Sequence, residues 1–135
     1  MLVDAGPLVA MMNDDDDRHR DCVEVAKGLR EPLITVWPAL AEAMHLLNFS
    51  WKAQDALWEM CEMGDCRLVA LDAADMKRMR ELMAKYRDRN MDLADAALVR
   101  VAEREKLNRI FTLDRKDFSV YRPGRWGRFH ILPEV

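Results

Sequence analysis

Short apolar runs alternate with longer amphipathic stretches along this chain. Runs of strand length, rich in aliphatic residues, predict strands at residues 2–3, 32–36, 67–71, 109–113 and 129–132, with the last of them at an edge of the sheet. Between them, apolar residues recur at helical spacing, which predicts helices at about 7–12, 18–29, 38–49 and 50–63 and further helices that begin near residues 72 and 92. The pattern therefore indicates strands separated by helices.

This order of elements predicts the fold class. A helical crossover allows consecutive strands to run parallel, and crossovers place helices on both faces of the sheet. We therefore expect an α/β fold, a three-layer α/β/α sandwich with a central, mainly parallel sheet. At 135 residues the chain has the length of a single domain, residues 1–135, and can bury a core without disulfides.

Composition narrows the class of protein. The formal net charge of −3 excludes nucleic-acid binding through overall charge, so any such binding must be local. The three cysteines form no Cys-x-x-Cys pair and have no histidines at zinc spacing, which indicates reduced thiols and a cytoplasmic protein. The chain begins without an apolar signal segment, and polar side chains interrupt its most apolar run, residues 33–51, so we expect no membrane span.

Acidic residues follow two of the predicted strands at the point where each strand ends. Asp4 comes directly after the first strand, and Asp114 follows the strand at residues 109–113. The carboxyl ends of parallel strands meet at one edge of a sheet, which is where ligands bind in such folds. We therefore expect the two carboxylates to lie near each other.

Further acids lie near the starts of predicted helices. Asp95 belongs to an almost wholly apolar helix, where an unpaired carboxylate is costly, although Asp92 and Asp95 also have the spacing of a helix-capping pair. Glu42 is the only formally charged residue between Leu33 and Trp51, which indicates a carboxylate held inward. The alternatives are a side chain that protrudes at a domain or subunit edge, or one that pairs with His45. These helix-start acids can converge with Asp4 and Asp114 across one cleft. Such a convergence favours a functional role for the carboxylates over a purely structural one.

A cluster of carboxylates needs a cation or protons to persist. Two carboxylates about 4 Å apart repel by roughly 4 kcal/mol at an effective dielectric constant near 20. Ligation by oxygen alone suits Mg²⁺ or Mn²⁺, and the chemistry that such an ion best supports here is phosphodiester hydrolysis. The sequence has no persuasive Ser-His-Asp or Cys-His set and no Walker-type Gly-x-x-x-x-Gly-Lys motif that would indicate a different reaction.

A basic segment follows Asp114. The local charge between residues 115 and 128 is plus four, because the single acid Asp117 stands against five basic residues: Arg115, Lys116, Arg122, Arg125 and Arg128. Such a flank beside an acidic centre suits a substrate with a phosphate backbone, and it equally suits a solvated surface.

The acids occur in an ordered set of motifs. Leu-Val-Asp4 is followed by Glu42 in the helix after the second strand, then by Asp-Leu-Ala-Asp95-Ala, and then by Thr-Leu-Asp114-Arg-Lys-Asp-Phe. This order resembles the PIN-domain family, particularly the VapC-type toxins of bacterial toxin and antitoxin pairs. The resemblance covers essentially the whole chain.

The resemblance implies a Mg²⁺- or Mn²⁺-dependent endoribonuclease. The main catalytic and metal-binding residues would be Asp4, Glu42, Asp95 and Asp114. Asp95 is preferred to its neighbour because it heads the Asp-Ala-Ala-Leu-Val run of the family helix.

Other residues of the motifs would assist this centre. Asp92 and Asp117 are its acidic neighbours, and Thr112 would position the site or the substrate. Nearby basic residues would hold the phosphates of the RNA, and the candidates for this role are Arg115, Lys116, Arg122 and Arg125.

The resemblance also implies protein partners. Similar proteins often form homodimers and are silenced by an antitoxin that inserts a segment near the acidic pocket. The alternative from another class is a non-catalytic PIN-like module that binds RNA or protein, with structural acids and Met-rich helices that dock a partner. That alternative predicts association without metal-dependent turnover.

Overall fold

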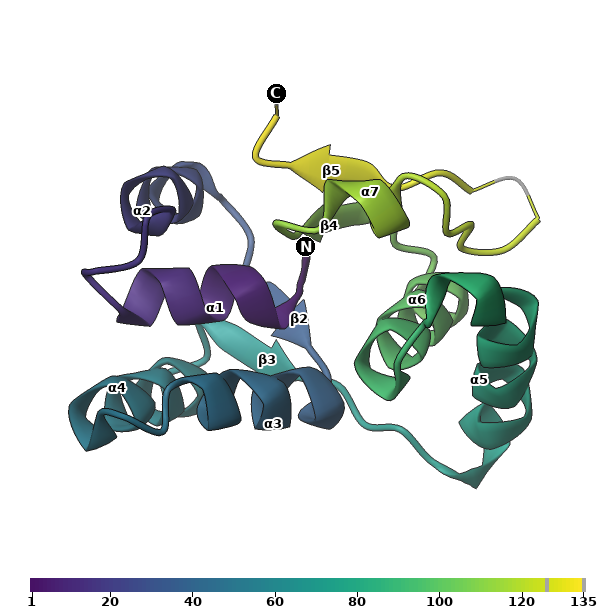
Figure 1. Ribbon diagram of the computed structural model, residues 1–135, viewed down its shortest axis with the longest axis horizontal. Helices are drawn as coiled ribbons and strands as arrows, with labels where there is room; N and C mark the ends of the chain where they lie inside the picture. The colour runs from purple at the N-terminus through teal and green to yellow at the C-terminus, as the bar shows by residue number, and fades with distance from the viewer. Residues whose placement is uncertain (126, 135) are drawn as a thin grey trace.

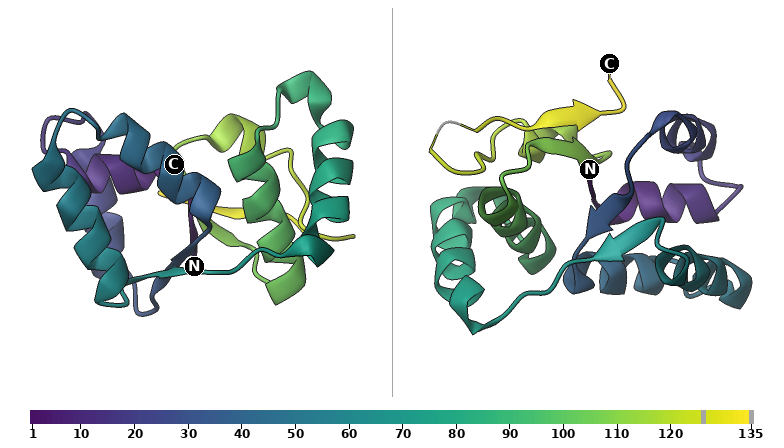
Figure 2. Two further views of the ribbon diagram at one scale, coloured as in Figure 1. Left: turned by 90° about the horizontal axis from the view of Figure 1, so that it is seen from below. Right: turned by 180° about the vertical axis from the view of Figure 1, so that it is seen from behind.

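Five short strands form one parallel sheet in the computed structural model, which describes residues 1–125 and 127–134. The strands are β1 (Leu2–Val3), β2 (Leu33–Thr35), β3 (Cys66–Leu68), β4 (Arg109–Phe111) and β5 (His130–Leu132). Their order is β3-β2-β1-β4-β5, with β1 at the centre and Leu2 opposite both Ile34 and Ile110. The sheet twists from β5 at one edge to β3 at the other (Figure 2).

Helices connect consecutive strands, as the sequence pattern predicted. They are α1 (Ala5–Met12), α2 (His19–Gly28), α3 (Trp37–Leu46), α4 (Trp51–Glu62), α5 (Ala73–Lys85), α6 (Leu93–Glu105) and α7 (Arg115–Phe118), with a 3₁₀ turn, η1, at Arg87–Arg89. Helices α1 to α4 gather on one side of the molecule, and α5 and α6 on the other (Figure 1). The predicted three-layer α/β/α sandwich is thus confirmed.

Alternate residues of the strands enter two separate hydrophobic layers. Leu2 and Ile110 belong to the layer beneath α5 and α6, whereas Val3 and Phe111 belong to the layer beneath α1 to α4. All four side chains have no solvent exposure. Side chains of consecutive strand residues point to opposite faces, so each central strand anchors both layers and holds its own carboxyl end rigidly.

Two of the predicted boundaries that differ from the structure are explained by specific contacts. Helix α1 begins at Ala5 and not at Pro7, because the Asp4 carboxylate accepts the Ala5 N–H at 2.8 Å and caps the helix; proline is tolerated within the first turn, where its missing N–H has no intrahelical partner. Strand β3 covers Cys66–Leu68, and the Val69 N–H makes the last bond to the carbonyl of Thr35, where β2 ends.

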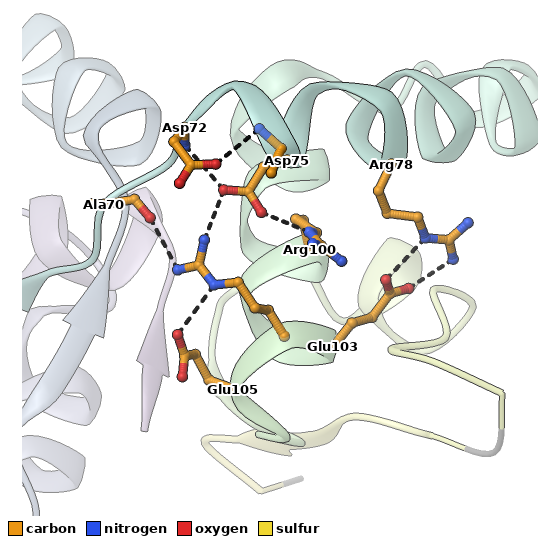
Figure 3. Close-up of polar contacts among 9 residues, drawn as sticks. Ala70, Asp72, Asp75, Arg78, Arg100, Glu103 and Glu105 are labelled. Atoms are coloured by element: carbon orange, nitrogen blue, oxygen red, sulfur yellow. Dashed lines mark hydrogen bonds and ion pairs between the residues drawn. The ribbon is translucent and has the colours of Figure 1, made fainter.

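An ionic network joins α5 to α6 (Figure 3). Asp75 is almost completely buried and accepts hydrogen bonds at 2.7 Å from both Arg100 and Arg104 of α6. Its carboxylate also accepts the N–H of Asp72, completing a capping box at the start of α5. This network fixes the helix that carries Asp95 to its neighbour.

Several large apolar side chains lie on the surface instead of in the core. Trp37 on α3 and Trp58 on α4 have ring centroids 6.3 Å apart, and both are exposed. Phe49 and Trp51, between and at the start of these helices, are exposed by 65% and 68%. Within residues 1–125 and 127–134, no helix is long and apolar enough to cross a membrane.

Candidate active site

One cavity of about 560 Å³ collects the acids singled out in the sequence. It lies at the carboxyl edge of the central strands, where β1 and β4 end and α6 begins. Its lining includes six carboxylates, contributed by Asp4, Glu42, Asp92, Asp95, Asp114 and Asp117, together with Gly6, Leu46, Asn90 and Leu113. The convergence expected from a parallel sheet is therefore present, and among the described residues no basic side chain lines this cavity.

Thr112 links the acids that follow the two central strands. Its buried hydroxyl donates to Asp4 Oδ2 at 2.9 Å and accepts the N–H of Asp114 at 3.0 Å. Asp4 Oδ1 accepts the N–H of Ala5, so both of its oxygens are oriented by the protein. The side chain of Asp114 in turn caps α7 by accepting the Asp117 N–H at 3.1 Å.

Asp92 and Asp95 have different local roles. Asp92 is the N-cap of α6 and accepts the N–H of Asp95 at 2.8 Å, so the capping interpretation holds for Asp92. Asp95 is half-buried, and its Oδ2 accepts a hydrogen bond from the Tyr121 hydroxyl at 3.1 Å. Capping thus explains the spacing of the pair, while the side chain of Asp95 is held toward the cavity by a tyrosine distant in sequence.

The prediction that Glu42 is held inward was wrong. Glu42 is an exposed residue of α3 that lines the rim of the acidic cavity. The scarcity of charge around it does not result from burial, because Trp37 is exposed by 54% and Leu46 by 49% on the same helix. Its alternative partner, His45, makes no ion pair with it among the described residues.

Burial and mutual repulsion disturb the ionisation of these carboxyls. Burial, followed by the charges of Asp92 and Asp4, raises the pKa of Asp95 to about 7, although the Tyr121 hydroxyl opposes the shift. Desolvation also raises the pKa of Asp4 and of Asp114, and partial desolvation together with the Asp4 and Asp92 charges raises that of Glu42. At neutral pH the cavity holds negative charge that costs free energy.

This charge predicts a pH dependence of stability without metal. Between the ordinary pKa of 3.8 and about 7, folded Asp95 keeps a proton that the unfolded chain releases, so the free energy of unfolding falls as pH rises. After allowance for the half-exposed site, we expect a loss of about 1–2 kcal/mol between pH 5 and pH 8. Urea unfolding in EDTA measures it, and a stability that stays level or rises across this range would contradict the expectation.

The donor set fits a hard divalent cation in its chemistry. Six carboxylates supply only oxygen ligands, and a cation would relieve the repulsion that raises their pKa values. Within residues 1–125 and 127–134, no three His, Cys, Asp or Glu side chains stand close enough together to hold one ion. Binding would therefore require rotation of the carboxylates toward a common point.

The predicted RNA-binding residues are placed differently from one another. Lys116 lies beside the acidic cavity, in a second cavity that Asp117 also lines. Arg115 donates to the carbonyl of Pro133, and Arg122 donates through Nη1 to the carbonyls of Ser119, Val120 and Tyr121. Arg125 lines a separate cavity formed by α6 and the loop that follows α7. Their roles stay predictions.

The structure adds two residues that the sequence analysis did not select. Tyr121 contacts Asp95 from a loop 26 positions later, and no sequence motif signals that contact. Arg89 Nη1 pairs with Asp117 Oδ1 at 3.1 Å from the turn before α6. A basic residue three positions before an N-cap acid could have attracted attention, but its orientation depends on the turn.

Comparisons with known proteins agree with this architecture. The model of the PIN domain family matches residues 1–122. The chain is 29% identical to Ribonuclease VapC26 of Mycobacterium tuberculosis over 135 residues, which cover 98% of this chain and 100% of that protein.

Two solved structures have a similar fold. The crystal structure of Mycobacterium tuberculosis VapC20, a sarcin-ricin loop cleaving toxin, superposes with a TM-score of 0.79 at 18% identity, covering 93% of this chain and 98% of that one. VapBC2 from Rickettsia felis, bound to a DNA fragment from its promoter, gives a TM-score of 0.66 at 15% identity with 96% of each chain covered. Together with the family match over most of its length, these findings show that the chain belongs to the PIN-domain family.

Proposed function

We propose that this chain is a divalent-metal-dependent endoribonuclease that hydrolyses RNA phosphodiester bonds and serves as the toxin of a toxin-antitoxin pair. The convergence of six carboxylates on one cavity of a PIN-domain chain carries the proposal. The relative named as a ribonuclease, matched along its whole length, supports RNA as the substrate.

The chain's own residues divide the work at this site. Asp4, Asp95 and Asp114 would hold Mg²⁺ or Mn²⁺, and Glu42 would bind it directly or through water and orient the attacking water. When bound, the ion activates that water and neutralises charge on the phosphate. Asp92 and Asp117 line the same cavity and would strengthen its field for the cation.

The direct test is cleavage of a mixed cellular RNA pool by the purified protein. We expect fragments with Mg²⁺ or Mn²⁺ and none with EDTA, because six bare carboxylates repel the RNA backbone when no cation is bound. Binding of RNA without turnover, even with Mn²⁺, would instead favour the non-catalytic binding module.

Thr112→Val is expected to reduce cleavage about 10-fold to 100-fold, because it removes the hydroxyl that joins Asp4 to Asp114 while it preserves the side-chain shape. Thr112→Ser keeps the hydroxyl and is the matched control. Initial rates under saturating metal compare the two variants. Equal loss in both variants would show that the methyl group, and not the hydrogen bonds, matters at this position.

Partners follow from the same assignment. We infer that a cognate antitoxin protein silences this chain in the cytoplasm and that the chain forms a homodimer. The VapBC2 structure of similar fold supports an antitoxin, and the exposed aromatic residues of α3 and α4 supply apolar surface for a protein contact. Light scattering of the purified chain measures its assembly; a monomeric mass at micromolar concentration would contradict the homodimer.

A further inference from the structure

A second cavity adjoins the acidic one and differs from it in charge. It measures about 570 Å³ and is lined by Asp88, Arg89, Asn90, Lys116 and Asp117. Asn90 and Asp117 also line the acidic cavity, so the two hollows share a wall. A chain-like ligand in the acidic cavity could therefore continue into its neighbour.

A short, well-anchored turn positions the first cation of this cavity. Arg89 ends η1, and Asn90 follows in the left-handed conformation at φ 56°, which asparagine tolerates better than most residues. Tyr86 and Met91, on either side of the turn, are buried and hold it to the core. Arg89 thus lies three residues before the N-cap of α6, on a backbone whose path is set.

The two cations retain donors for a ligand. Arg89 donates a hydrogen bond through Nη1 to Asp117. Within residues 1–125 and 127–134, its Nε and Nη2 have no protein acceptor. The Lys116 ammonium has no ion pair among the same residues and is exposed on α7. Arginine presents five N–H donors and lysine three, so both can bind a phosphate group.

The acidic cavity repels the RNA backbone, so cations beside it are required to bind the phosphates. Even with a bound cation, its carboxylates oppose the approach of a polyanion, and none of the residues that the structure describes brings a basic side chain to its lining. Among the basic residues predicted to hold RNA, Arg115 and Arg122 donate to backbone carbonyls and Arg125 lines a different cavity. Lys116, joined by Arg89, is the one placed beside the acids.

We propose that the cavity lined by Arg89, Asn90 and Lys116 is a phosphate subsite that binds the RNA backbone next to the bond that is cleaved. Arg89 and Lys116 are the phosphate-binding residues there, and they attract the RNA backbone without recognising a base. This inference rests on the proposed function for its substrate, but RNA binding tests it separately from cleavage.

The experiment measures fluorescence anisotropy of a labelled, single-stranded RNA of mixed sequence with the full chain carrying Asp4→Asn, in Mg²⁺, from 50 to 200 mM KCl. We expect Arg89→Gln and Lys116→Gln each to weaken binding about 3-fold to 10-fold and to lower the slope of log affinity against log salt by about 0.7, as one lost single-strand phosphate contact does. Lys52→Gln removes the same charge from exposed α4 and should leave both quantities unchanged.

Two comparisons separate binding from folding and from catalysis. Arg89→Lys keeps the positive charge and should restore most of the salt slope that Arg89→Gln loses. If the Arg89–Asp117 pair were purely structural, Arg89→Gln would leave the salt slope at the value of the parent chain. Variants that match Lys52→Gln, or an absence of RNA binding in all chains, would overturn the subsite. If the wild-type chain fails to cleave RNA while Arg89→Gln and Lys116→Gln still weaken binding, the nuclease assignment fails and the subsite stands.

Discussion

Asp4→Asn is expected to reduce RNA cleavage by more than about 100-fold, the upper range for loss of a residue that only supports a metal ligand. The substitution removes the negative charge at the carboxyl end of the central strand while keeping an oxygen that can cap α1 through Ala5. Asparagine and aspartate are comparable N-caps, so the fold should persist. Initial cleavage rates with Mg²⁺ or Mn²⁺ measure the loss.

Asp55→Asn is the matched control for that variant. Asp55 is an exposed residue of α4 that does not line the acidic cavity, so its neutralisation should leave cleavage unchanged. Circular dichroism should show the same helix content in both variants. Cleavage at the wild-type rate by Asp4→Asn would remove Asp4 from the catalytic centre.

Asp75→Ala is expected to lower the free energy of unfolding by about 3 kcal/mol. It strips two arginines of a buried partner and breaks the capping box of α5. Removal of one member of a buried ion pair costs about 3–5 kcal/mol, and a lost cap adds about 1 kcal/mol. Arg100 and Arg104 are partly exposed, however, so water recovers part of this cost. Urea unfolding followed by circular dichroism measures the change.

Glu105→Gln removes an exposed partner of Arg104 and is the control, with an expected loss below about 1 kcal/mol. Burial would raise the pKa of Asp75, but the Asp72 N–H and the two arginines outweigh it and lower the pKa below 3.8. The contribution of Asp75 is therefore present above pH 4 and disappears as pH falls further. Equal stability of Asp75→Ala and Glu105→Gln at pH 7 would refute a stabilising role for this network.

The local signals in the sequence correctly located most elements of the fold. Periodicity and capping act over a few neighbouring residues, which is why Asp72 and Ser50 mark the starts of α5 and α4 as predicted. The end of β3 and the start of α1 were predicted wrongly, because the first depends on a neighbouring strand distant in sequence and the second on a polar side chain that caps the helix. Strand β3 stops where β2 offers no further partner, and α1 starts early because Asp4 caps it.

The ordered acids were visible in the sequence because parallel strands deliver their carboxyl ends to one edge. Asp4 and Asp114 follow that rule, and the cavity lined by both agrees with it. The exposure of Glu42 was not predictable from its apolar neighbours, because α3 leaves apolar side chains such as Trp37 on the surface. Hydrophobicity of a segment indicates burial only on average.

The sequence by itself determined the alternation of strands and helices, the helix caps, and the acids at the ends of β1 and β4. Tertiary structure alone decided which distant side chains meet them. Tyr121 binds Asp95, and Arg89 pairs with Asp117. Such contacts depend on strand order and turn geometry, which join residues far apart in the chain, whereas caps and periodicity depend only on neighbours.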